Sequence, residues 1–420
     1  MFKKIRRNTA IAVAACVAIF LVSEQAQAAT LKEEFPFYGS GVGSGGAVPL
    51  NGNLLYSNQQ LYGVTYAGGM IVGPNEEYIS ATDLGSIYQY AISGPGVPIN
   101  LYGFSGPDGS HPNGGLVADA QGNLYGTTQD GGANNMGTVF KLSPPQSAGG
   151  TWTLTTLHSF AGTDGETPLA GVTIGPNGNL YGTTSTLTGS NDPCCGNVFT
   201  LSTTGTGFHV MAQLYPNAGP RTNVVVDPQG NVIGTTYMST VIRGEGSLFK
   251  VTPSGTYSTV TIFQESGAIN GLSTAGPIGN IVRDTAGNIY GMLSSVQNNA
   301  TAQSGAGIFE VTAVTHQLVI LAVLDGLKAQ SGVVRDAAGD LYGTTINGGT
   351  TGTGSIFMLS PGGTVTTLAS LPSSMQAPVS GVISDPTGKM WGTSSEGGAL
   401  CTTSSNVTPT GCGTLFSLSP

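Results

Sequence analysis

The chain has 420 residues, only 8% of them charged, and a formal net charge of −9 at pH 7. This acidic balance argues against nucleic acid or an anionic membrane surface as a partner, because both are negatively charged. Glycine accounts for 66 residues, and a glycine-rich, weakly charged chain favours turns and polar strands over helices.

The first 28 residues have the features of a secretory signal peptide. Basic residues precede an apolar run from Ala10 to Val22, and Ala26-Gln27-Ala28 forms a small-x-small cleavage pattern. The run is shorter than the roughly 20 apolar residues that span a bilayer. We expect cleavage near Ala28 and a secreted or periplasmic protein without a transmembrane segment. Its formal charge becomes −12, because four basic residues and Glu24 are removed.

Two other export signals overlap this segment. Val13–Cys16 resembles a lipoprotein cleavage box, and Arg6-Arg7 resembles a twin-arginine signal. Cleavage before Cys16 would leave the apolar segment Val17–Val22 on the mature protein, so an ordinary cleaved signal is favoured over lipidation.

A short phrase repeats along the rest of the chain. The heptapeptide GNLYGTT occurs at 122–128 and again at 178–184. Its aromatic or apolar residue before glycine recurs at intervals of 49 to 63 residues, at Tyr62, Tyr125, Tyr181, Ile233, Tyr290, Tyr342 and Trp391. A period near 55 residues without helical periodicity is typical of propeller blades. The repeat predicts an all-β, seven-bladed β-propeller in one domain, residues 29–420.

Each repeat is predicted to form four antiparallel strands. A short apolar strand and a turn, as in 332–339, precede the Leu-Tyr-Gly-Thr-Thr strand. A third strand follows at 137–142 and its equivalents, and a fourth at 152–160. The fifth repeat departs from the pattern, with Met292-Leu293 in place of Thr-Thr. We interpret the repeated aromatic residue as packing between blades, and its glycine as a position of close approach or bending.

The two ends of the chain predict how the ring closes. The seventh repeat ends at Pro420 after its third strand, whereas the segment Leu31–Gly39 precedes the first strand of the first repeat. We expect this N-terminal segment to supply the fourth strand of the last blade, which would remove two open sheet edges.

The string from Tyr125 to Leu142, Tyr-Gly-Thr-Thr, then Gly-Gly, then Gly-Thr-Val-Phe-Lys-Leu, resembles the GloVer (Gloeo/Verruco) tandem repeat family. The resemblance implies an exported bacterial repeat protein with no reaction assigned to the repeat. Members often carry C-terminal surface anchors. Because none follows Pro420, we expect the periplasm or the medium. The Asp-x-x-Gly-Asn turn is similar to that of NHL-type and two-component-regulator propellers, which supports the fold alone.

The loops between the second and third strands vary in length and define the predicted binding face. The longest belong to the first and seventh blades, which become neighbours in a closed ring. They carry Tyr66, Glu76, Glu77, Tyr78, Asp83 and Glu396. Tyrosines beside carboxylates suit a sugar or a cation. The alternative is a pair of solvated insertions.

Export makes disulfides the default state of the remaining cysteines. Cys401 and Cys412 flank the base of the seventh-blade loop and predict a local disulfide. Cys194 and Cys195 are adjacent, so they form either a vicinal disulfide or two free thiols. No histidine is close enough in the sequence to either pair to suggest zinc.

Other polar residues offer weaker candidates. His111, His158, His209 and His316 are scattered and predict no catalytic triad. Arg283 and Arg335 end first strands in neighbouring blades, so they predict either an anion site at the channel or two arginine–carboxylate pairs. Asp108 and the segment Asp164–Glu166 are possible Ca²⁺ ligands without a spaced ligand series, so we expect no obligatory cofactor.

The leading functional prediction is a non-enzymatic, monomeric propeller that binds a carbohydrate or protein on its variable-loop face. The alternative is an extracytoplasmic enzyme, a polysaccharide lyase or hydrolase or a lactonase, with its site at the channel mouth. A third possibility is a structural surface protein with no ligand. Fold alone does not choose between these classes.

Overall fold

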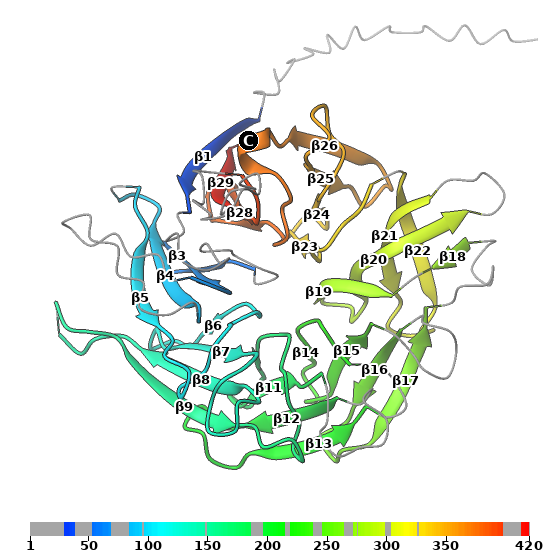
Figure 1. Cartoon of the computed structure of the whole chain (residues 1–420). Helices are drawn as coiled ribbons and strands as arrows, with labels where there is room; N and C mark the ends of the chain where they lie inside the picture. The colour runs from blue at the N-terminus through cyan, green and yellow to red at the C-terminus, as the bar shows by residue number, and fades with distance from the viewer. Residues whose placement is uncertain are drawn as a thin grey trace, which may run out of the picture.

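The computed structural model describes thirteen segments of the chain, residues 29–37, 53–68, 84–94, 96–147, 149–185, 196–214, 219–237, 246–263, 272–274, 276–298, 304–325, 327–397 and 413–419. Within them, all regular elements are strands apart from one 3-10 helix, η1 (Ser373–Met375). The strands form seven antiparallel sheets arranged as a ring, with the first strands innermost (Figure 1). The predicted seven-bladed β-propeller is confirmed.

Six blades contain consecutive strands. Blade one comprises β2 (Leu55–Ser57), β3 (Gln60–Thr65), β4 (Ser86–Ala91) and β5 (Ile99–Gly103). Blade two comprises β6 (Val117–Ala118), β7 (Leu124–Thr128), β8 (Thr138–Ser143) and β9 (Thr153–Ser159). Blade three comprises β10 (Thr173–Ile174), β11 (Leu180–Thr183), β12 (Asn197–Leu201) and β13 (His209–Gln213). Blade four comprises β14 (Val225–Val226), β15 (Val232–Thr236), β16 (Ser247–Val251) and β17 (Tyr257–Ile262).

Blade five has five strands, because β18 (Leu272–Thr274) and β19 (Pro277–Arg283) both pair with β20 (Ile289–Asn298). It continues with β21 (Ser304–Val311) and β22 (Leu318–Asp325). Blade six comprises β23 (Val334–Arg335), β24 (Leu341–Thr345), β25 (Ser355–Leu359) and β26 (Val365–Ser370). Blade seven combines β27 (Ile383–Ser384), β28 (Met390–Ser394) and β29 (Thr414–Ser419) with β1 (Thr30–Pro36).

The second glycine of the repeated GNLYGTT motif makes room for an aromatic ring on the next strand. Gly126 pairs with Phe140, and a Cβ at Gly126 would lie 2.6 Å from Cζ of that ring. The same conflict occurs at Gly182 with Phe199, at 2.5 Å. The glycine is therefore needed because the fully buried aromatic ring of the third strand lies directly across it. This close approach explains the glycine more specifically than bending of the strand does.

The aromatic residue before this glycine packs against the following blade, as the sequence predicts. Tyr125 of blade two is fully buried and clusters with Val172, Leu180 and Phe199 of blade three. Its hydroxyl donates a 2.8 Å hydrogen bond to Asp119 Oδ2 in the turn between the first two strands. Burial and the Asp119 carboxylate both raise the pKa of Tyr125, so this hydroxyl stays a donor.

Tyr125→Phe is expected to lower the free energy of unfolding by about 1.5 kcal/mol, because the half-buried Asp119 carboxylate loses a donor. Urea unfolding followed by circular dichroism would measure the change. Tyr257→Phe is a matched control, since its hydroxyl meets Thr259 at the surface, 3.3 Å away. Equal losses in the two variants would contradict the role assigned to the Tyr125 hydroxyl.

Strand β1 closes the ring by pairing with β29, as predicted. The register runs from Thr30 opposite Ser419 to Pro36 opposite Thr414, and the Phe37 amide donates to Gly413 O at 2.9 Å. A second link joins blades seven and one at the centre, where the Gly381 amide donates to Asn53 Oδ1 at 2.9 Å. The last blade is thus built from both ends of the chain, and the paired residues of β1 and β29 are 378 to 389 positions apart in sequence (Figure 1).

Candidate functional site

The residues predicted to form a loop wall lie partly outside the described residues, namely Glu76, Glu77, Tyr78 and Asp83. Tyr66 stacks on His111, with ring centroids 4.8 Å apart, and His111 Nδ1 lies 3.0 Å from Asp130 Oδ2. Glu396 contacts the connection between blades six and seven, where its amide donates to Gln376 O at 3.3 Å. Among the described residues, no hydrogen bond or ion pair joins Tyr66 to Glu396.

All four cysteines of the predicted disulfides, Cys194, Cys195, Cys401 and Cys412, also lie outside the described residues. Their pairing stays a prediction.

The two predicted anion-site arginines face different blade interfaces. The Arg335 guanidinium lies over the ring of Tyr290, 5.6 Å from its centroid, between blades five and six. Arg283 lines a small pocket between blades four and five, and its Nη1 donates to Asp284 O at 3.4 Å. Neither arginine forms an ion pair with a carboxylate in the part of the chain that the structure describes.

The possible Ca²⁺ ligands stabilise loops. Asp108 Oδ1 accepts from both the amide and the hydroxyl of Ser105 at 2.9 Å, and Asp108 Oδ2 accepts from Tyr102. Asp164 accepts from the Ala161 amide at 2.8 Å and lies 2.8 Å from His158 Nε2. Over the described ranges, no group of three or more His, Cys, Asp or Glu side chains is placed to hold a metal ion.

A pocket of about 560 Å³ lies at blades four, five and six. Its lining comes from residues before or at the start of first strands, from residues in the last part of or just after second strands, and from the start of one third strand. By their positions in the chain, these residues belong to the face of the variable loops. They are Arg221, Tyr237, Pro277, Ile278, Gly279, Asn280, Ser294, Ser295, Ser304, Gly305, Leu327, Lys328, Ala329, Gln330 and Ile346.

An arginine stacked on a tyrosine forms one side of this pocket. The Arg221 guanidinium lies 4.5 Å from the ring centroid of Tyr237, and Arg221 is exposed. Stacking leaves the edge of the guanidinium free to donate hydrogen bonds. Lys328 lies in the connection between blades five and six, where its amide donates to Asn347 Oδ1 at 2.5 Å and its carbonyl accepts from the Ile346 amide at 2.8 Å.

The chemistry of the lining is that of hydrogen-bond donors with positive charge. Three serine hydroxyls, two side-chain amides and two cationic residues line the pocket, and its described lining contains no Asp, Glu, His or Cys. Such a set can hold a polyhydroxylated or anionic molecule.

An irregularity in the repeat is the sequence signal for this pocket. In blade two, Thr128 Oγ1 and Thr138 Oγ1 lie 2.8 Å apart and join the second and third strands. Blade five has the buried pair Met292-Leu293 at the Thr-Thr position, and β20 continues to Asn298. The extension brings Ser294 and Ser295 into the pocket, whereas nothing in the sequence pattern pointed to Arg221 or Tyr237.

No helix in the described residues is long and apolar enough to cross a membrane.

Comparisons with solved structures agree with the architecture. The chain is similar to oligogalacturonate lyase from Vibrio parahaemolyticus, with a TM-score of 0.54 and 10% identity over 88% of this chain and 90% of that one. At this identity the likeness concerns the fold alone.

Two further structures have TM-scores under 0.5. The extracellular domain of a proposed one component system from B. thetaiotaomicron has a TM-score of 0.48 and 10% identity over 91% of this chain. This chain spans 39% of the length of that one. A proposed 6-phosphogluconolactonase from Bacteroides uniformis has a TM-score of 0.47 and 14% identity over 80% of this chain and 90% of that one.

Sequence comparison is decisive for the family. No curated protein sequence matches this chain. The model of the Gloeobacter/Verrucomicrobia repeat matches residues 18–237 and again residues 219–420. These two matches span the seven blades, and the chain therefore belongs to the Gloeobacter/Verrucomicrobia repeat family.

Proposed function

We propose that this protein is an exported β-propeller that binds an acidic carbohydrate in the pocket of blades four, five and six. The observation that carries the proposal is the pocket itself, which places Arg221, Tyr237 and Lys328 around one space on the variable-loop face. Its volume of about 560 Å³ lies within the usual range of small-molecule sites, roughly 300–1,000 Å³.

The charge of the lining supports an acidic rather than a neutral sugar. The chain has only 13 Lys and Arg residues against 22 Asp and Glu, yet two basic residues line this pocket and no acidic one is among its described lining. A guanidinium pairs well with a carboxylate, and serine hydroxyls and amides pair with sugar hydroxyls.

The residues of this lining fit ligand binding better than acid–base catalysis. General acid–base chemistry on a polymer or a lactone most often uses carboxylates or histidines within reach of the reacting bond, and less often lysine or tyrosine. The described lining supplies cations, hydroxyls and amides instead. Catalysis by an extracytoplasmic enzyme of this fold is therefore the second candidate.

Calorimetric titration of the purified protein with oligogalacturonate and with an uncharged oligosaccharide of equal length tests the proposal. We expect saturable binding of the acidic oligomer. At an oligomer concentration of 100 times Kd, the free energy of unfolding should rise by about 2.7 kcal/mol. Arg221→Gln is expected to weaken binding at least tenfold. Arg335→Gln is a matched control, because that arginine also stacks on a tyrosine but lies outside the pocket.

Equal weakening in both arginine variants would show that the pocket is not the site. A lack of response to every acidic oligosaccharide would overturn the carbohydrate proposal and leave a protein partner as the next ligand to test. Release of new reducing ends or unsaturated products during the titration would favour the enzymatic alternative.

A further inference from the structure

A second pocket lies between blades four and five, beside a position where the repeat lacks its aromatic residue. In four blades the aromatic polar atom donates to the Oδ2 atom of the turn aspartate. The distances are 2.8 Å for Tyr125 to Asp119, 3.1 Å for Tyr290 to Asp284, 3.1 Å for Tyr342 to Asp336 and 3.0 Å for Trp391 to Asp385. In blade four, Ile233 takes the aromatic position and has no polar atom to donate.

The turn aspartate of blade four is nevertheless retained. Asp227 is 8% exposed, and its Oδ1 accepts from the amides of Gln229 at 3.0 Å and Asn231 at 2.8 Å. Its Oδ2 accepts from Asn231 Nδ2 at 2.8 Å. In blade two the same Oδ2 of Asp119 accepts from both Asn123 Nδ2 and the Tyr125 hydroxyl. Asp227 Oδ2 is therefore an acceptor of the kind to which a tyrosine hydroxyl donates in other blades of the propeller.

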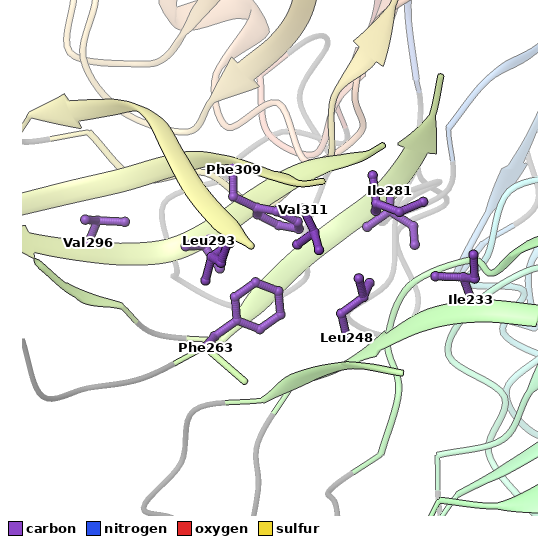
Figure 2. Close-up of a cluster of buried hydrophobic side chains, with 10 residues drawn as sticks. Ile233, Leu248, Phe263, Ile281, Leu293, Val296, Phe309 and Val311 are labelled. Atoms are coloured by element: carbon purple, nitrogen blue, oxygen red, sulfur yellow. The ribbon is translucent and has the colours of Figure 1, made fainter. Parts of the chain in front are cut away.

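A pocket of about 150 Å³ opens beside Asp227 and Ile233. Its apolar wall comes from both blades and comprises Ile233, Leu248, Val260, Ile289 and Val311. Figure 2 shows Ile233 and Leu248 on one side of this blade interface and Val311 on the other. The combination of an apolar wall with one buried carboxylate suits a ring that carries a single hydroxyl group.

The cations that cover the aromatic ring in other blades are also retained. Lys141 lies over Tyr125, 5.9 Å from its centroid, and Arg335 of blade six lies over Tyr290, at 5.6 Å. Lys250 has the register of Lys141, since it pairs with Ile233 as Lys141 pairs with Tyr125. Arg283 has the position of Arg335 at the end of a first strand. Both Lys250 and Arg283 line the pocket.

Asp227, Ile233, Lys250 and Arg283 line this pocket together with apolar neighbours, Thr312 and His316. We propose that the pocket, termed the phenol slot, binds a small phenol. The ligand hydroxyl donates to Asp227 Oδ2, and its ring packs on Ile233 and Leu248 with a cation over its face. A volume of about 150 Å³ holds one ring rather than an oligosaccharide. The slot is separate from the pocket of blades four, five and six, so the two proposals stand independently.

Titration with phenol, monitored by calorimetry, tests the slot. We expect saturable binding of one equivalent, with a Kd of about 1 mM or tighter. Toluene lacks the hydroxyl and cyclohexanol lacks the aromatic face, and each is expected to bind at least fivefold more weakly. N-acetyltyrosinamide distinguishes the source of the ring, because tighter binding of this compound than of phenol would identify a tyrosine side chain of a polypeptide.

Two substitutions in equivalent places make the test specific. Ile233→Tyr restores the ring of the other blades, and it is expected to abolish phenol binding and raise the melting temperature. Tyr290→Ile opens a comparable vacancy beside Asp284 and under Arg335, with Glu310 in the place of Lys250, and it is expected to add a second equivalent of bound phenol. Arg221→Gln should leave phenol binding unchanged.

If Ile233→Tyr fails to fold, Ile233→Phe fills the slot without a hydroxyl and should still block phenol. Phenol binding that survives both substitutions would overturn the proposal. So would the absence of saturable binding by phenol and N-acetyltyrosinamide alike.

Discussion

Removal of residues 29–37 together with the predicted signal is expected to unfold the protein or cause it to aggregate. These residues include β1, which supplies the fourth strand of blade seven. Phe37 is fully buried and Phe35 is 8% exposed, and both cluster with Tyr88, Trp391 and Leu415. Without β1, strand β29 becomes an open edge and this cluster loses two aromatic side chains.

Removal of β1 is expected to lower the free energy of unfolding by more than most single domains can tolerate. Truncation of one buried phenylalanine costs about 3–5 kcal/mol, whereas folded domains are stable by about 5–15 kcal/mol in total. Urea unfolding and static light scattering of chains that begin at residue 29 and at residue 38 would measure the difference. Phe37→Ala provides an intermediate, with an expected loss of about 3–5 kcal/mol. Equal urea midpoints for the two chains would show that β1 does not hold the ring closed.

Glu34→Gln is expected to lower the free energy of unfolding by about 2–3 kcal/mol at pH 7. The Glu34 side chain is 4% exposed. Its Oε1 accepts from Lys389 at 2.9 Å and Ser417 at 2.7 Å, and its Oε2 accepts from Lys32 at 2.6 Å. Burial alone would raise the pKa of this carboxyl, but these hydrogen bonds outweigh it and lower the pKa to about 2.

The pH dependence of stability follows from the direction of this shift. The carboxyl titrates near its ordinary value of 4.5 in the unfolded chain and near 2 in the folded one. The contribution of Glu34 is therefore complete above about pH 5 and is lost as the pH falls towards 2. The gap between wild type and Glu34→Gln should close over the same range, as measured by urea unfolding at several pH values. Glu33→Gln on the same strand is the control, and a gap that does not change with pH would contradict this account.

The Glu34 carboxylate also joins β1 to its neighbours in the fold. Closure of the ring is therefore expected to be sensitive to Glu34. Lys389 precedes β28, Ser417 lies on β29, and Tyr90 on β4 of blade one donates to Glu34 Oε2 at 3.3 Å. One side chain thus contacts three other strands or turns of the closing blade and its neighbour. The burial of Tyr90 and the Glu34 charge raise the pKa of that tyrosine to about 12.

The repeat made the fold predictable because the blades pack against one another with similar residues at equivalent positions. The aromatic residue at 125 and its equivalents fills the interface to the next blade, and the third-strand Phe140 must lie opposite a glycine. A pattern that recurs seven times therefore reports the number of blades directly. The missing fourth strand of the last repeat, together with the spare N-terminal segment Leu31–Gly39, predicted closure by β1.

The candidate sites were not predictable in this way, because they depend on departures from the repeat rather than on the repeat. Arg221 and Tyr237 belong to blade four, whereas Lys328 precedes blade six, and only the curvature of the ring brings them around one pocket. The prediction based on loop length pointed instead to blades one and seven. It selected Tyr66 and Glu396, whose described contacts are with His111 and with Gln376.

By itself, the sequence determined the all-β class, the seven blades and the closing strand, since strand alternation and a fixed repeat are local properties of the chain. Only the tertiary structure decided what the irregular positions do. Ile233 is merely an exception in an alignment of repeats, but in the ring it leaves a pocket beside Asp227, Lys250 and Arg283. The physical reason is that a ligand site is formed by side chains from neighbouring blades, and their separation in space is set by packing of the ring rather than by spacing along the chain.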